Sequence, residues 1–239
     1  MPKLCKRTVI ISALAVVFLV LELALSLWIQ FPTDTPTRYV CYSSVVLAFV
    51  FGVTCYKKDY NYLFTVLALA FTVIADYFLV LPESPNQLPG MIFFSVAQLL
   101  YAVKLFFSQK DKKARIIHLV VRVALSIIAV TLTVLVLGEN ADSVGIISMF
   151  YYANLVVNIV YAFITKNYLF GVGLCLFACC DAIIGLSVMT EGYLPIPDTS
   201  FIHKILHPGF NIVWAFYAPS QTLIALSLVK PKLLNKPIK

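Results

Sequence analysis

The sequence predicts an all-α protein, a polytopic membrane bundle of eight transmembrane helices that forms a single integral membrane domain over residues 1–239. Composition is the first observation: 61% of the residues are hydrophobic and 12% are charged, against roughly 45–50% and about 25% in soluble domains. The mean hydropathy is accordingly +0.93. The second observation is a series of apolar runs of about 20 residues, the length that crosses a hydrocarbon core of roughly 30 Å. Open sheets are not tolerated in lipid and barrel strands alternate with period two, so the runs predict helices.

Eight such runs follow one another, separated by short stretches that contain proline, glycine or charged residues. The spans are predicted at residues 9–30, 38–56, 61–81, 88–108, 116–137, 143–165, 168–189 and 208–229. The longest connection, residues 190–207, contains two prolines, which prevent a continuous helix. It is either a lid over a site or an interfacial segment.

The distribution of Lys and Arg predicts the orientation in the membrane. Fourteen of the 18 lie in the terminal segments and loops on the side of the N-terminus, against Arg38 and Lys204 on the opposite side, while Lys104 and Arg122 fall within spans near the basic side. Cytoplasmic loops carry the positive excess, so both termini are expected in the cytoplasm. The net charge of +7 then reflects topology and anionic headgroups, which makes membrane lipids the expected partners and excludes a nucleic-acid role.

Two solitary carboxylates in apolar spans are the strongest functional signal. Asp76 lies in the third span and Asp181 in the seventh. A charged side chain at membrane depth costs a few kcal/mol on insertion scales, so such residues usually have a function. Glu22 in the first span is a third carboxyl, either hydrogen-bonded to a neighbouring helix or part of the same site. A purely structural pairing of the aspartates with Tyr or Asn side chains is the alternative interpretation.

Further polar residues in the spans recur at helical spacing and are expected to form one buried layer with the aspartates. Spacings of three or four residues place side chains on a common helix face, and the residues concerned are Gln98, Tyr101, Asn154, Tyr217 and Gln221. Both halves of the chain have four spans, an Asp in the third and a Gln and a Tyr in the fourth. This similarity predicts a parallel 4+4 internal repeat, an architecture whose sites lie between the halves.

Other kinds of site have little support. His203 and His207 have a metal-ligand spacing, with Asp198 as the nearest third donor, but two interfacial histidines are favoured over zinc. The cysteines form no C-x-x-C pattern, and no phosphate-binding glycine loop or G-x-S-x-G element occurs. No metal and no cofactor are therefore expected, which leaves carboxylate chemistry or a cation held by carboxylates.

Four short motifs in order along the chain resemble those of the lysoplasmalogenase family, the YhhN-like membrane proteins. The motifs are Ala75-Asp76-Tyr77-Phe78-Leu79, Gln98 with Tyr101, Cys180-Asp181-Ala182-Ile183-Ile184, and Tyr217-Ala218-Pro219-Ser220-Gln221. The chain departs from the family pattern where Ala75 and Cys180 replace a Gly or Ser, and where Gln98 replaces a His. An amide can hydrogen-bond but cannot transfer a proton at neutral pH.

The resemblance implies hydrolysis of the vinyl-ether bond of a lysophospholipid-type substrate to a fatty aldehyde and a glycerophospho-alcohol. Asp76 and Asp181 are then the catalytic residues, acting as acid and base in an order that the sequence leaves open. The remaining polar residues, Gln98, Tyr101, Asn154, Tyr217 and Gln221, would bind substrate or water. The alternative is a non-enzymatic membrane carrier, or a lipid- or cation-binding protein.

Overall fold

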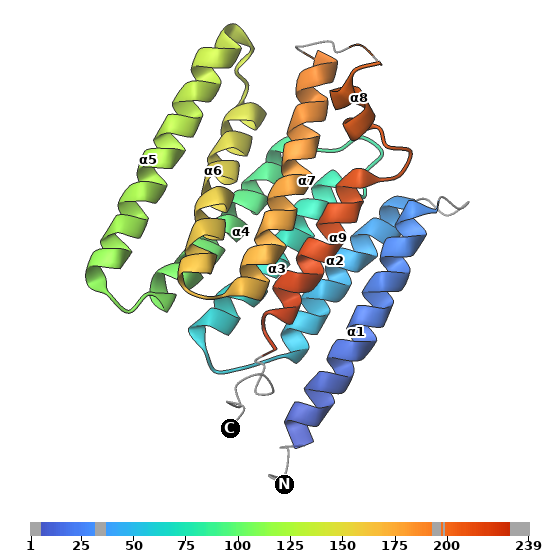
Figure 1. Ribbon diagram of the computed structural model, residues 1–239, viewed down its shortest axis with the longest axis vertical. Coiled ribbons are helices and arrows are strands. Elements are labelled where there is room, and N and C mark those ends of the chain that lie inside the picture. The colour runs from blue at the N-terminus through green and yellow to red at the C-terminus, as the bar shows by residue number, and fades with distance from the viewer. Residues whose placement is uncertain (1–5, 32–36, 193–196, 198, 230–239) are drawn as a thin grey trace.

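A computed structural model describes residues 6–31, 37–192, 197 and 199–229, and this part of the chain contains helices and no strand. The all-α membrane architecture is thereby confirmed. In chain order (Figure 1) the elements are α1 (Lys6–Gln30), α2 (Thr37–Thr54), α3 (Tyr60–Leu79), α4 (Gln87–Ser108), α5 (Lys112–Leu137), η1 (Gly138–Asn140), α6 (Ser143–Ile164), α7 (Tyr168–Gly192), α8 (Phe201–Leu206) and α9 (Ile212–Leu226).

Aspartates in the loops explain where several helices begin. The Asp59 side chain accepts a hydrogen bond from the backbone N–H of Asn61 at the start of α3. Asp111 caps α5 in the same way, and Asp142 caps α6 by accepting from Gly145 at 2.7 Å. Each carboxylate satisfies a backbone donor that a helix leaves without a partner in its first turn. These three aspartates, which lie outside the apolar runs, thus cap the starts of helices.

The first seven predicted spans correspond to seven helices that are long and apolar enough to cross a membrane. The eighth is shorter than predicted: α9 has 15 residues, a length of about 22 Å, where the sequence predicted a span over residues 208–229. The reason is local, because Gly209 has a φ of +81° and Asn211 caps the helix by accepting from the backbone N–H of Trp214. A left-handed residue and a cap end the extended segment and start the helix later than hydropathy suggests.

The predicted connection over residues 190–207 is partly helical. Helix α7 extends to Gly192 and α8 forms a single short helix further on, while residues 193–196 and Asp198 lie outside the described residues. The role of this segment as a lid stays a prediction.

Many of the helix–helix contacts recur in the two halves of the chain, while the internal repeat itself stays a prediction. In the first half α1 packs on α2, α2 on α3 and α3 on α4; in the second, α5 packs on α6, α6 on α7 and α7 on α9. Across the halves α4 contacts α5 and α6, and α9 contacts α1 and α2. Exchange of the halves maps these contacts onto one another, with α1 and α5 at opposite edges (Figure 1). However, α3 also packs on α9, and no comparable contact joins α7 to α4 in the described residues. The start of α1 and the end of α9 lie at the same end of the bundle.

Small residues bring the inner helices into close contact. Ala68, Ala75, Ala97 and Ala225 are fully buried in the main core cluster. At Gly173 a Cβ atom would lie 2.9 Å from Ile224 Cγ1, so α7 and α9 approach closely there. Helices in lipid depend on such close contacts to associate, because lipid tails are as apolar as the helix surfaces and no hydrophobic force drives the helices together. The tight inner helices hold the intramembrane polar residues in fixed positions.

Candidate active site

Asp76 lies near the end of α3 with its side chain directed at α9. Its exposed fraction is 2%. The hydroxyl of Tyr217 on α9 donates a hydrogen bond to Asp76 Oδ2 at 2.5 Å. This is the short distance expected of an O–H donor on a carboxylate oxygen. The contact joins the third helix of one half to the fourth helix of the other.

Asp181 occupies the middle of α7. The side chain of Tyr151 on α6 forms a polar contact with it. Its Oδ2 atom is buried and makes no hydrogen bond within the described part of the chain. One oxygen of this carboxyl is therefore available to a ligand.

The two carboxyls belong to one cluster, since Asp76 and Asp181 interact electrostatically and Tyr217 interacts with both. Aromatic rings close this cluster. Phe94 of α4 lies between its two tyrosines, with ring centroids 6.0 Å from Tyr151 and 6.4 Å from Tyr217. Apolar surroundings strengthen every electrostatic interaction among these groups. We name Asp76, Tyr151, Asp181 and Tyr217 the carboxyl cluster.

Two of the predicted polar residues, Gln98 and Asn154, are hydrogen-bonded within a second buried network. Asn158 Nδ2 donates to Gln98 Oε1 and to its backbone oxygen, both at 2.9 Å. Arg122 Nη1 donates to Asn154 Oδ1 at 2.7 Å, and Nη2 to Asn158 Oδ1 at 2.7 Å. The single polar layer expected from the sequence is thus divided into two clusters, and this one joins α4, α5 and α6.

The centre of this second network is a residue that sequence reasoning placed near the edge of the membrane. Arg122 is the eleventh residue of α5, about 15 Å along the helix, and its exposed fraction is 7%. Its Nη2 lies 2.8 Å from Nε2 of His118, whose Nδ1 lies 2.7 Å from the Gln109 amide. An Arg in an apolar run with a His four residues earlier was the available signal, because that spacing places both on one face. We name Gln98, Gln109, His118, Arg122, Asn154 and Asn158 the arginine network.

The sequence profile of the YhhN family matches residues 37–228. The chain belongs to the YhhN family. This is the family of lysoplasmalogenases and is linked to hydrolase activity. The match runs from α2 to the end of α9 and includes every predicted site residue, while α1 precedes it. No curated protein and no solved structure matches the chain.

Three of the seven predicted site residues of this YhhN protein carry a buried polar atom that has no hydrogen-bond partner within the described residues. These atoms are Gln98 Nε2, Asp181 Oδ2 and Gln221 Oε1, while the buried hydroxyl of Tyr101 lies beside Thr72. Most buried polar groups in proteins are paired. Groups that can donate and groups that can accept are both represented, so this set suits a polar ligand or water.

The third intramembrane carboxyl of the YhhN chain has a different environment. Ser44 Oγ donates to Glu22 Oε2 at 2.6 Å, and Thr222 of α9 lies beside it. Glu22 therefore joins α1 to α2 and α9 as a hydrogen-bonded carboxyl. The two histidines that the sequence offered as metal ligands, His203 and His207, have ring centroids 4.5 Å apart. No group of three His, Cys, Asp or Glu residues lies close enough to hold a metal ion in the described ranges.

Proposed function

We propose that this YhhN protein hydrolyses the vinyl-ether bond of a lysoplasmalogen-type lysophospholipid, with Asp76 and Asp181 as its catalytic residues. The observation that carries the proposal is the carboxyl cluster: two carboxyls from different helices interact in a buried aromatic environment. Family membership supports the reaction class. Carboxylates that served only to bind helices together would not require a second carboxyl at the same place.

Cleavage of a vinyl ether begins with a proton transfer to carbon. One carboxylic acid donates its proton to the β-carbon, the π-electron pair of the C=C bond forms the new C–H bond, and an oxocarbenium ion results. Water adds to the cationic carbon and loses a proton to a carboxylate, giving a hemiacetal. Breakage of the C–O bond, with a proton delivered to the leaving glycerol oxygen, releases a fatty aldehyde and the glycerophospho-alcohol.

The carboxyl cluster supplies the groups that these steps need. One carboxyl must be protonated and the other ionised, as in glycosidases, which form a related oxocarbenium ion. Asp76 and Asp181 take these two roles as a coupled pair. Tyr217 donates to Asp76 and thereby fixes the direction of its other oxygen. The rings of Phe94 and Tyr217 limit access of water and present π-faces that attract a cation.

The remaining predicted residues bind the substrate or the attacking water, or hold neighbouring side chains in place. Gln98, Tyr101 and Gln221 each offer a buried polar atom for the glycerol hydroxyl or the attacking water. Asn154 acts indirectly, because its amide is bonded to Arg122 and Ser126. With both termini in the cytoplasm, as the charge distribution predicts, the carboxyl cluster lies in the outer half of the bilayer. A single-chain substrate enters such a site from lipid between helices.

The direct test uses purified full-length protein, a synthetic lysoplasmalogen and, as control, the saturated alkyl-ether lysophospholipid, in D₂O. The expected product is a fatty aldehyde with one deuterium on the carbon next to the carbonyl, trapped at once by reduction. The saturated ether yields no aldehyde, because it has no π-bond to protonate. Saturable lysolipid binding without aldehyde would refute hydrolysis and favour the non-enzymatic carrier.

A further inference from the structure

A groove opens where the middle of α5 faces α4 and α6, and no residue of the carboxyl cluster lines it. Its volume is about 520 Å³, within the range of small-ligand pockets. Helix α5 packs chiefly against α6 and little against α4, which leaves the groove open to lipid. Its walls are almost entirely apolar and come from three helices: Leu99, Leu119, Val123, Ile127, Val130 and Phe150.

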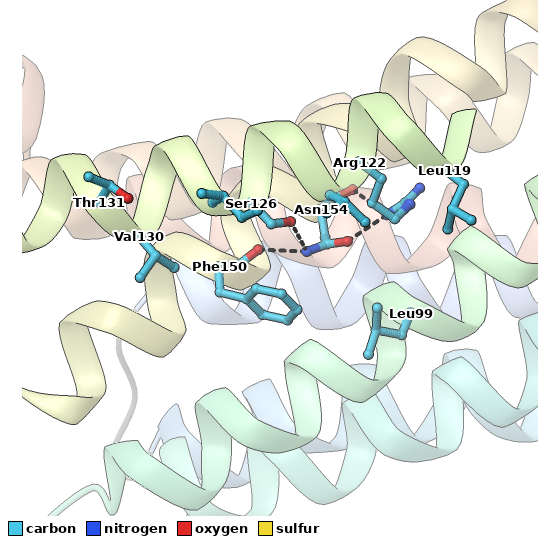
Figure 2. A pocket seen from close by; sticks show the side chains of 10 residues that line it. Leu99, Leu119, Arg122, Ser126, Val130, Thr131, Phe150 and Asn154 are labelled. Atoms are coloured by element: carbon cyan, nitrogen blue, oxygen red, sulfur yellow. Dashed lines mark hydrogen bonds between the residues drawn. The ribbon is translucent and has the colours of Figure 1, made fainter. Parts of the chain in front are cut away.

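A small polar floor interrupts these apolar walls. Arg122, Ser126 and Asn154 line the groove together (Figure 2) and are connected by hydrogen bonds. Arg122 Nη1 donates to Asn154 Oδ1, and Asn154 Nδ2 donates to Ser126 Oγ at 3.2 Å. The polar groups are thus held in place by one another before any ligand arrives.

Arg122 carries a charge that no carboxylate of the described residues balances. The ion pair that occurs within the described residues is Arg38 with Glu83. The side chains that hydrogen-bond to Arg122 are those of Asn154, Asn158 and His118, and Tyr161 also lies near it. A guanidinium cannot lose its charge in a protein. In an apolar region an unbalanced charge is costly, and a paired anion reduces that cost.

The His118 ring strengthens this arrangement. Arg122 can only donate, so Nε2 of His118 accepts this hydrogen bond. None of the hydrogen bonds within the described ranges uses Nε of Arg122. The guanidinium is therefore held by its two terminal nitrogens and retains a donor for a further partner.

We propose that this groove is a second lipid site, separate from the carboxyl cluster, which binds a long-chain carboxylate with its anionic group on Arg122 and its chain along the apolar walls. Charge complementarity selects an anion, and the Nε–H of Arg122 can donate one charge-assisted hydrogen bond to a carboxylate oxygen. The depth of Arg122 selects a small headgroup, because a glycerophospho-headgroup would bring further polar groups for which the walls offer no partners. The occupant is thus a fatty acid and not a phospholipid.

The test measures equilibrium binding of radiolabelled palmitate to the purified full-length protein in lipid nanodiscs. We expect saturable binding that unlabelled palmitate displaces, with hexadecanol, methyl palmitate and lysophosphatidylcholine at least about ten-fold weaker, as the loss of a charged hydrogen bond implies. Arg122→Gln should weaken binding by a similar factor. Arg38→Gln, which removes a guanidinium elsewhere, should leave it unchanged.

A second pair of variants keeps the test valid if Arg122→Gln fails to fold. Val123→Trp fills the groove without changing its charged residue and should abolish binding, whereas Leu125→Trp, on α5 but outside the groove, should not. Asp76→Asn should retain palmitate binding, which separates this proposal from the hydrolytic one. The proposal is overturned if the wild type shows no saturable binding, if hexadecanol or lysophosphatidylcholine competes as well as palmitate, or if folded Val123→Trp binds normally.

Discussion

Removal of one hydroxyl, in Tyr217→Phe, tests whether the carboxyl cluster performs chemistry. The substitution deletes the 2.5 Å hydrogen bond to Asp76 and keeps the ring. Its contacts with Phe177 and Trp214, with centroids 5.3 Å and 5.1 Å away, are unaffected. The variant is therefore expected to fold with a loss of the order of 1 kcal/mol in unfolding free energy.

The expected effect on rate follows from the strength of that bond. A hydrogen bond to a charged group contributes about 1.5–3 kcal/mol, and each 1.4 kcal/mol in the activation free energy changes the rate about ten-fold. Aldehyde release by Tyr217→Phe should thus fall roughly 10- to 150-fold. Because Tyr217 positions Asp76, the loss should be in kcat more than in KM.

Tyr62→Phe is the matched control. Its hydroxyl donates to the Val53 carbonyl at 3.0 Å, and it lies on α3 about 21 Å from Asp76. We expect this variant to lose similar stability and no activity. The reasoning is refuted if Tyr217→Phe releases aldehyde at close to the wild-type rate, or if both variants lose activity to the same extent.

Three further substitutions test packing, the arginine network and the number of catalytic carboxyls. Gly173→Ala places a Cβ against α9 and should lower the unfolding free energy by about 1–3 kcal/mol. The control, Gly185→Ala, meets no atom within 4 Å and should leave the unfolding free energy unchanged. Thermal melting in detergent compares the two variants, and equal melting temperatures would contradict the close packing of α7 on α9. Asn158→Ala removes an acceptor from a buried guanidinium and should lower the unfolding free energy by about 2–3 kcal/mol. Asn61→Ala, at a partly buried site, should lower it less. Thermal melting compares these two variants, and a smaller effect of Asn158→Ala would contradict the arginine network. Glu22→Gln should leave aldehyde release unchanged, and a large loss would show a third catalytic carboxyl.

The architecture was predictable because lipid imposes a simple rule on sequence. Runs of about 20 apolar residues are needed to cross it, and seven of the eight predicted spans have helices that meet this requirement. The eighth differed because Gly209 and Asn211 act on the backbone locally, within a stretch that hydropathy alone scores as continuous. The ends of helices depend on caps and φ angles, and these are weaker signals in sequence than apolar length.

The site was predictable in its residue types and only partly in their partners. An intramembrane carboxylate is rare enough to be recognised in any sequence, which is how Asp76 and Asp181 were found. Spacing along one helix says which side chains share a face, but not which neighbouring helix that face contacts. For this reason Asn154 was expected beside the aspartates and instead contacts Arg122. The contact of Tyr151 with Asp181 was missed for the same reason.

The central claim is that two carboxyls act together on a vinyl ether. The measurement that tests it most directly is aldehyde release from a synthetic lysoplasmalogen by the purified wild type, Asp76→Asn and Asp181→Asn, each checked for folding by its thermal transition. We expect aldehyde from the wild type and a loss of activity in both folded variants. Full activity in either folded variant, or no aldehyde from the folded wild type, would contradict the account.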